Sequence, residues 1–256
     1  MKRLWLIVVV AMACQAKKTT TEVLQLSVPA APPALISIDT ASQIISDYLT
    51  NPRIDLSQRA LGGVFPVSDF TPDAKNEGLL MWYCFDAAAK QLFMAIEPYL
   101  HYDAEKLPRY PIQLILRRPV NTYLYNGASP TEKDVKDFLL NQKLIGTSAD
   151  IDNATATRYV KSFDSLMNTM VDASGQRYQE YPFNYFIWGA DYKTFISWAG
   201  ADGYIRYDLA FNDKDKPNRV RIVLIATDKD GNTVTGAQGF KEPGGQGIQN
   251  GWPPPP

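Results

Sequence analysis

The sequence predicts an α+β fold of two divergent tandem units, each a helix followed by an antiparallel meander. Similar openings, Ile38-Asp39-Thr40-Ala41 and Ile151-Asp152-Asn153-Ala154, each lead into apolar residues at helical spacing. A proline–aromatic element and several strand-like runs follow each helical pattern. A helix that covers one face of such a meander gives the α+β class. We therefore expect an internal duplication; the alternative is that two helix-plus-meander segments share only generic patterning.

Both helices are predicted from apolar side chains that recur every three or four residues. One stripe runs from Ile38 to Leu49 and the other from Tyr159 to Met170. Asp39 and Asp152 are the expected N-caps, because a carboxylate at this position accepts hydrogen bonds from first-turn amides.

The strands are predicted from runs of β-branched and aromatic residues. In the run from Tyr204 to Phe211, Ile205 and its alternate neighbours face one way, while Arg206 and Asp208 face the other. The other predicted strands are 79–85, 91–99, 111–117, 183–188, 193–198 and 219–226.

A short helix from about residue 130 to 141 is expected between the two units. Ser129-Pro130-Thr131-Glu132 reads as a capping box with proline at the first helical position. The whole chain then divides into a signal peptide over residues 1–13, a tether over 14–36, a first unit over 37–128, a connecting region over 129–148, a second unit over 149–238 and a disordered Gly/Pro tail over 239–256.

The N-terminus has the layout of a secretory signal. Lys2-Arg3 precedes an apolar run that ends in small residues, and Cys14 follows at once. Residues 4–14 resemble a bacterial lipoprotein signal peptide, and this resemblance implies that Cys14 is lipidated and becomes the mature N-terminus. Gln15 in place of Asp implies, by the same resemblance, the periplasm-facing outer membrane of a Gram-negative bacterium. The alternatives are secretion after Ala13 and an uncleaved anchor.

Composition narrows the range of functions. The 256 residues hold 26 Lys and Arg against 27 Asp and Glu, so the basic excess typical of nucleic-acid binders is absent from the sequence. One histidine, His101, and two cysteines leave no basis for a His-rich metal site or a disulfide framework. Cys84 lies in an apolar run, where we expect a buried side chain. We expect no metal and no cofactor.

Paired carboxylates are the one hydrolytic chemistry that the sequence leaves open. Five acidic residues lie near apolar runs where burial would raise their pKa: Asp86, Glu97, Glu180, Asp191 and Asp208. No pattern singles out a pair among them. The run Asp228–Asn232 offers oxygen ligands, but it is better explained as a hairpin turn than as a calcium site.

Aromatic residues are concentrated between Tyr178 and Phe211. Core packing explains most of them, but Trp188, Tyr192 and Trp198 are expected to include at least one exposed anchor for a ligand. We therefore expect a non-catalytic, lipid-anchored envelope protein that binds another envelope component or protein. The main alternative is a carbohydrate-binding or glycan-processing lipoprotein that uses the aromatic segment, and a further one is a hydrolase with paired carboxylates.

Overall fold

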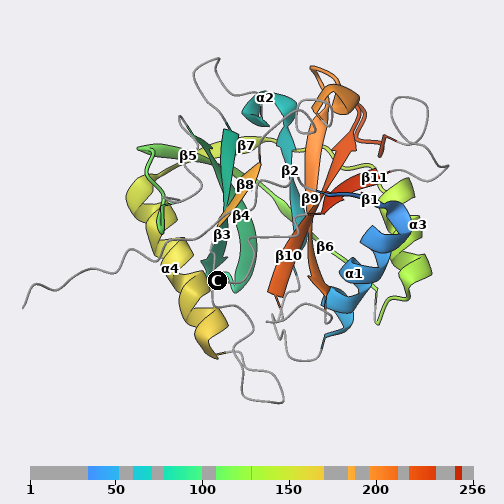
Figure 1. The fold of residues 1–256 in the computed structure, drawn as a ribbon, viewed down its shortest axis with the longest axis horizontal. Coiled ribbons are helices and arrows are strands. Elements are labelled where there is room, and N and C mark those ends of the chain that lie inside the picture. The colour runs from blue at the N-terminus through green and yellow to red at the C-terminus, as the bar shows by residue number, and fades with distance from the viewer. Residues whose placement is uncertain are drawn as a thin grey trace, which may run out of the picture.

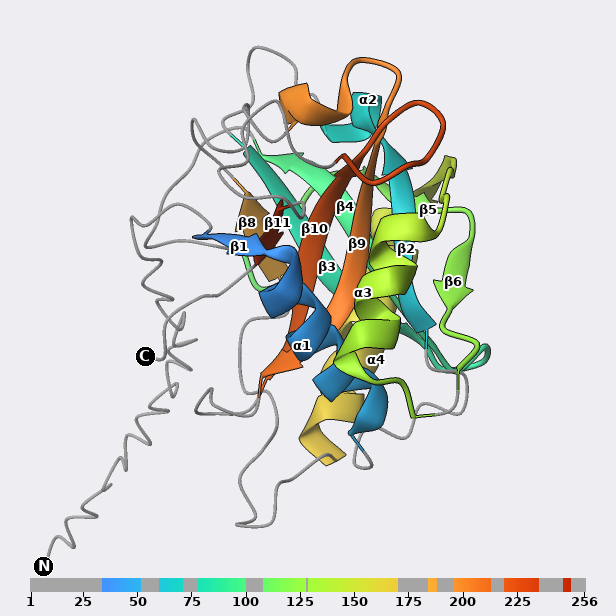
Figure 2. The same cartoon turned by 90° about the vertical axis from the view of Figure 1, so that its right-hand side faces the viewer.

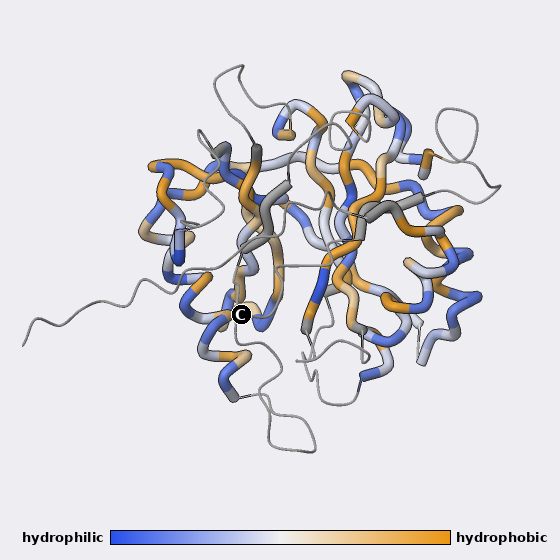
Figure 3. Tube along the Cα trace, viewed as in Figure 1, coloured by the Kyte–Doolittle hydropathy of each residue, from blue (hydrophilic) through white to orange (hydrophobic). Residues whose placement is uncertain are grey.

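Two antiparallel sheets lie face to face, with helices on both outer sides (Figure 1). The computed structural model describes residues 34–51, 60–70, 78–99, 108–127, 129–169, 184–187, 196–212, 219–234 and 246–249. Within them the fold is α+β, as the sequence predicts. In Figure 3 the apolar colour is strongest along the strands and alternates with the polar colour along the helices, which bury one face only.

The first sheet, sheet A, has six strands in the order β1-β11-β10-β9-β2-β6. These strands are β1 (Ala34–Ser37), β11 (Gln246–Gln249), β10 (Arg219–Thr227), β9 (Tyr204–Asn212), β2 (Ala60–Pro66) and β6 (Thr122–Leu124). Its outer face is covered by α1 (Ile38–Thr50) and α3 (Glu132–Asn141), which lie side by side in Figure 2.

The second sheet, sheet B, has five strands in the order β7-β5-β4-β3-β8. These strands are β7 (Ser148–Asp152), β5 (Ile115–Pro119), β4 (Gln91–Tyr99), β3 (Gly78–Asp86) and β8 (Asn184–Ile187). Its outer face is covered by α4 (Asn153–Thr169), where the rings of Tyr83 and Phe163 stack at 5.1 Å. The short helix α2 (Val67–Phe70) follows β2.

Apart from the edge strand β6, the two sheets share one topology, and each takes strands from both predicted units. The unit β1-α1-β2 completes a sheet with β9, β10 and β11. In the same way, β7-α4-β8 completes a sheet with β3, β4 and β5. The helix α1 therefore packs on β9, and α4 packs on β3. The predicted tandem units 37–128 and 149–238 do not each form a sheet of their own, because both sheets take strands from both ranges. The internal duplication stays a prediction.

Cleaving the chain between Gly127 and Ser129 is expected to leave one folded particle. Each half supplies an edge segment and a helix to the other half's meander, so the fragments have most of their contacts with each other. A protease site inserted there allows the test by native size-exclusion chromatography. Two separate peaks, each with the ordered circular dichroism of the intact chain, would show that the halves fold independently.

The helix starts confirm one predicted cap and correct the other two. Asp152 caps α4 as expected, since its Oδ1 accepts from the Thr155 amide at 2.8 Å. In α1, however, the cap is Ser37, whose Oγ accepts from the Thr40 amide at 3.1 Å, and Asp39 is exposed in the first turn. The α3 capping box is formed by Thr131 and Asp134, two residues after the predicted one, so the proline precedes the helix.

Three predicted segments differ from the structure. The tether of 14–36 ends earlier, because β1 begins at Ala34. The tail of 239–256 is ordered over 246–249, where the backbone of β11 pairs with both β1 and β10. Residues 196–199, expected at the end of a strand, form a helical turn that Gly200 ends at a φ of +77°. No helix within the described residues is long and apolar enough to cross a membrane.

Candidate functional site

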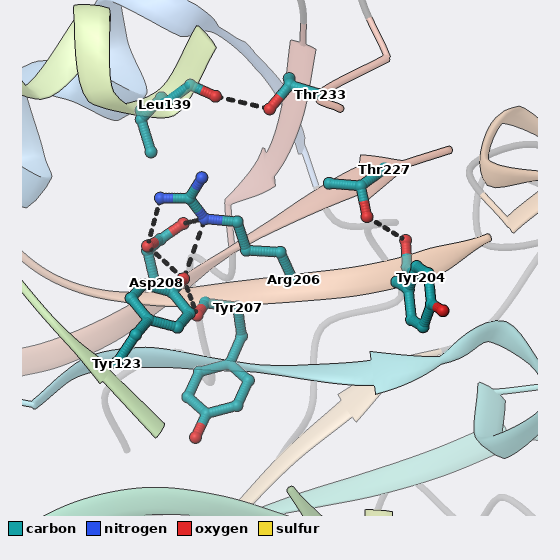
Figure 4. Close-up of polar contacts among 8 residues, drawn as sticks. All are labelled: Tyr123, Leu139, Tyr204, Arg206, Tyr207, Asp208, Thr227 and Thr233. Carbon is teal, nitrogen blue, oxygen red and sulfur yellow. Dashed lines mark hydrogen bonds and ion pairs between the residues drawn. The ribbon is translucent and has the colours of Figure 1, made fainter. Parts of the chain in front are cut away.

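A charged cluster lies buried on the outer face of sheet A (Figure 4). Arg206 and Asp208 are both fully buried, and Nε of Arg206 lies 2.8 Å from Oδ2 of Asp208. Nη2 of Arg206 donates to Oδ1 of Asp208 at 3.0 Å. The Tyr123 hydroxyl, from β6, accepts from Nε at 2.8 Å and donates to Oδ1 at 2.6 Å. The cluster therefore attaches β6 to the middle of the sheet.

The helix α3 closes this cluster from outside. The guanidinium carbon of Arg206 lies 4.9 Å from the Phe138 ring centre and 5.2 Å from that of Tyr123. Thr233 donates its hydroxyl to the Leu139 carbonyl, which fastens α3 to the segment after β10. Burial raises the pKa of Asp208, against the lowering effect of Arg206. Because both charged side chains are buried and paired with each other, we assign the cluster a structural role.

A second buried carboxylate, Glu97, lies between the two sheets. Tyr83 faces α4, so the alternate residues Leu80 and Trp82 face sheet A, and Glu97 is paired with Leu80 on that face. Oε1 of Glu97 accepts from Nε1 of Trp82 at 2.9 Å. Burial raises the pKa of Glu97, although backbone donors and Trp82 lower it.

Glu97 also holds the segment that leads into β5. Its Oε2 accepts from the amides of Ile112 at 3.1 Å and Gln113 at 2.8 Å. From the other side, Nδ2 of Asn153 donates to the carbonyls of Pro111 and Gln113, both at 2.8 Å. The Asn153 amide donates to the Leu114 carbonyl at 3.0 Å. Two side chains and one backbone amide thus hold this segment in place.

Three apolar side chains project to solvent from this fixed backbone. Ile112 is 53% exposed, Leu114 82% and Ile115 51%. We call these three residues the apolar ridge. Isolated exposed apolar residues are ordinary, but three within four positions on an immobilised backbone form a patch of the kind that marks interaction sites. The ridge ends at Ile115, the first residue of β5, and Leu114 lies next to the start of α4 through its hydrogen bond with Asn153.

Basic side chains flank the ridge along α4. Nζ of Lys161 lies 5.2 Å from the ring centre of Tyr110, two residues before the ridge. Arg158 lies one turn earlier on α4 and is exposed. At the other end, Arg117 pairs with Asp150 at 2.8 Å. Asp152, just before α4, and Asp164 within it carry the opposite charge, so the surface combines apolar side chains with charges of both signs.

The buried carboxylates are not arranged as an acid/base pair. Tyr207 points between the sheets, since its hydroxyl accepts from the Met94 amide at 3.2 Å, so its neighbour Asp208 faces outward. Glu97 lies between the sheets, and sheet A therefore separates the two. Asp86 accepts from the amides of Ala88 and Ala89 in the β3–β4 turn. Glu180 and Asp191 lie outside the described residues.

The predicted aromatic site is only partly described. Trp198 is 8% exposed and belongs to the core, so it is not the exposed anchor that the sequence suggested. Trp198 and Ala199 of the helical turn 196–199 both belong to the buried core, which the flanking sequence does not reveal. Trp188 and Tyr192 lie outside the described residues, so their exposure stays a prediction, and with it the carbohydrate-binding alternative.

Two smaller predictions are confirmed, those for Cys84 and for residues 228–232. Cys84 is fully buried, as expected, and burial raises the pKa of its thiol. Asp228–Asn232 forms a turn in which Oδ1 of Asp228 accepts from the amides of Asp230 and Asn232, with Gly231 at a φ of +78°. Among the described residues there is no group of three or more metal-ligating side chains. Cys14 and His101 lie outside the described part.

The apolar ridge was not predicted from the sequence, although the sequence holds a signal for it. Residues 111–117 were predicted as a strand, but Ile112, Leu114, Ile115 and Leu116 do not alternate strictly with polar residues. One face of a strand cannot bury consecutive apolar residues. No family model, curated protein or solved structure matches this chain.

Proposed function

We propose that the protein is a non-catalytic, lipid-anchored component of the cell envelope that binds another envelope component through the apolar ridge. One observation carries the binding role: Ile112, Leu114 and Ile115 are exposed on a backbone that Glu97 and Asn153 hold in place. A fixed, exposed apolar surface lowers the conformational entropy that binding costs. It does nothing for the stability of the free chain.

The non-catalytic part of the proposal rests on the structural contacts that the two buried carboxylates make. Glu97 accepts hydrogen bonds from Trp82 and from the backbone before β5, and Asp208 is paired with Arg206 and Tyr123. Each is engaged in holding two parts of the chain together. The anchor rests on the resemblance of residues 4–14 to lipoprotein signal peptides, and the same resemblance supports placement on the periplasmic side of the outer membrane.

Replacing Cys14 by Ser tests the anchor. Without the thiol no acyl chain can be attached, so we expect the protein to move from the membrane fraction to the soluble fraction after cell breakage. Mass spectrometry of the wild-type N-terminus provides the independent check. An unmodified Cys14 in the wild type would refute the anchor.

Binding to isolated cell envelopes tests whether the ridge is the binding surface. The chain of residues 14–256 with Cys14→Ser has no acyl chain, so its binding reports on the protein surface alone. We expect Ile112→Ser with Leu114→Ser to weaken envelope binding at least tenfold, since each apolar side chain loses most of its transfer free energy. Ile145→Ser is the matched control: Ile145 is 65% exposed, but it precedes the Ser148 end of β7, whereas the ridge adjoins the Asp152 end. Equal binding of all three proteins would refute the proposed function.

A further inference from the structure

We infer that two copies of this chain exchange halves and form a domain-swapped dimer. We call the described parts of 34–127 the first half and those of 129–249 the second half. In the dimer, the first half of each copy completes both sheets with the second half of the other. The partner is thus a second copy of the same chain, and the inference does not depend on the proposed function.

Neither half holds a complete sheet. In sheet A, β2 of the first half pairs with β9 of the second, and in sheet B, β3 and β5 of the first half pair with β8 and β7 of the second. The helices also cross the boundary, since α1 packs on β9 and α4 packs on β3. A half by itself would expose strand edges and apolar faces. Each half therefore requires another half, either from its own chain or from a second copy.

A second copy supplies the same contacts as the chain's own half. The buried cluster joins Tyr123 of the first half to Arg206 and Asp208 of the second. The ion pair of Arg117 with Asp150 also crosses the boundary. Because domain swapping exchanges identical elements, all these contacts form again between copies. Monomer and dimer therefore differ in the connection between the halves and in their dependence on chain concentration.

The connection between the halves is strained at Ser129. This residue has a φ of +48°, in the left-handed region that favours glycine, so its side chain adds a conformational cost. Pro130 follows, and a residue before proline prefers an extended backbone. The closed monomer therefore holds Ser129 in a conformation that both its own side chain and the next residue disfavour.

An open connection releases this strain. Gly127 and Ser129 are exposed, so the segment between Tyr125 and Thr131 can extend without uncovering the core. Ser129 then takes the extended backbone that a residue before proline prefers, and it does so in both copies of the dimer. A short connection under strain is a known cause of domain swapping. The strain at Ser129 thus favours the dimer over the closed monomer.

The exchange takes place during folding. Opening a folded monomer separates strands and helices from the core, so it requires most of the free energy of unfolding, whereas unfolded chains meet each other freely. A half joined by a short connection has an effective concentration on the order of 1 mM, so the monomer predominates in dilute solution. At chain concentrations that approach this value, the released strain shifts the balance towards the dimer.

A disulfide across the boundary tests this inference in the chain of residues 14–256 with Cys14→Ser, in which Cys84 is buried. Arg117 and Asp150 are cross-strand partners in β5 and β7, and their side chains are 49% and 59% exposed. Arg117→Cys with Asp150→Cys therefore places two thiols within reach of each other outside the core. After refolding at about 1 mM chain and oxidation, we expect a disulfide-linked dimer on a denaturing gel without reductant, and after refolding at about 1 µM a linked monomer.

Two further variants complete the test, and circular dichroism checks that each is folded. Asp86→Cys with Gln91→Cys is the matched control: both residues belong to the β3–β4 hairpin of the first half, so their disulfide stays within one chain in monomer and dimer alike. Ser129→Gly relieves both connections and should lower the ratio of linked dimer to linked monomer by about tenfold in the Arg117→Cys, Asp150→Cys chain. The inference is overturned by linked monomer alone at the high concentration, by equal dimer from both cysteine pairs, or by an unchanged ratio with Ser129→Gly.

Discussion

Replacing Asp208 by Ala is expected to lower the free energy of unfolding by about 3–5 kcal/mol, because it leaves the Arg206 charge buried without its partner. The Tyr123 hydroxyl would lose its acceptor at 2.6 Å at the same time. Urea unfolding followed by circular dichroism measures the change. The effect is expected to be large because the guanidinium is enclosed by Phe138 and Tyr123 and has no route to water.

A matched double variant separates the charge from the packing. Replacing the pair with Arg206→Met and Asp208→Leu removes both charges, so the loss of stability should be clearly smaller than for Asp208→Ala alone. Tyr123→Phe removes a single hydroxyl and should cost about 1–2 kcal/mol. A double variant that is less stable than Asp208→Ala would contradict the assignment of a buried, mutually dependent ion pair.

Replacing Glu97 by Gln is expected to cost about 2–3 kcal/mol and to loosen the ridge. An amide offers one acceptor oxygen where the carboxylate has two, so the donors Trp82 Nε1 and the amides of Ile112 and Gln113 cannot all be satisfied. Hydrogen exchange at Ile112 and Gln113 should therefore become faster. Trp82→Phe frees only Oε1 and serves as the control, with slow exchange kept at both amides.

Acid pH should affect the wild type and Glu97→Gln differently. Burial raises the pKa of Glu97 above its ordinary value of 4.5, so between that value and the folded-state pKa the folded chain binds more protons than the unfolded chain. The stability of the wild type relative to Glu97→Gln should be greatest below pH 4.5 and should decrease as pH rises through the folded-state pKa. A relative stability that increases with pH over this window would contradict the raised pKa.

Local sequence patterns predict the secondary structure of this chain better than its tertiary contacts. The alternation in β9 correctly places Arg206 and Asp208 on one face, because strand periodicity is a local property. It does not reveal that Tyr123 and Phe138 cover that face, since both come from a segment more than sixty residues earlier. The same pattern in a solvent-facing strand would look identical.

The sharing of strands between the two halves of the chain could not be predicted from the sequence for a related reason. The buried stripes of α1 and α4 show that each helix covers a sheet, but both stripes have similar residues, such as Ile45 and Tyr48 in one and Val160 and Phe163 in the other. Nothing in a stripe specifies which of two similar sheets it covers. Likewise, the ridge is held by Glu97, which precedes this segment in the sequence, and by Asn153, which follows it.

The most direct test of the proposal that the ridge is the binding surface is hydroxyl-radical footprinting of the wild-type protein in isolated cell envelopes and after extraction into detergent. Ile112, Leu114 and Ile115 should be modified several-fold less in the envelopes, while the exposed Ile145 and Leu124 should react equally in both states. Equal modification of the ridge in both states, or protection of Ile145 and Leu124 instead, would contradict the claim that the ridge binds the envelope.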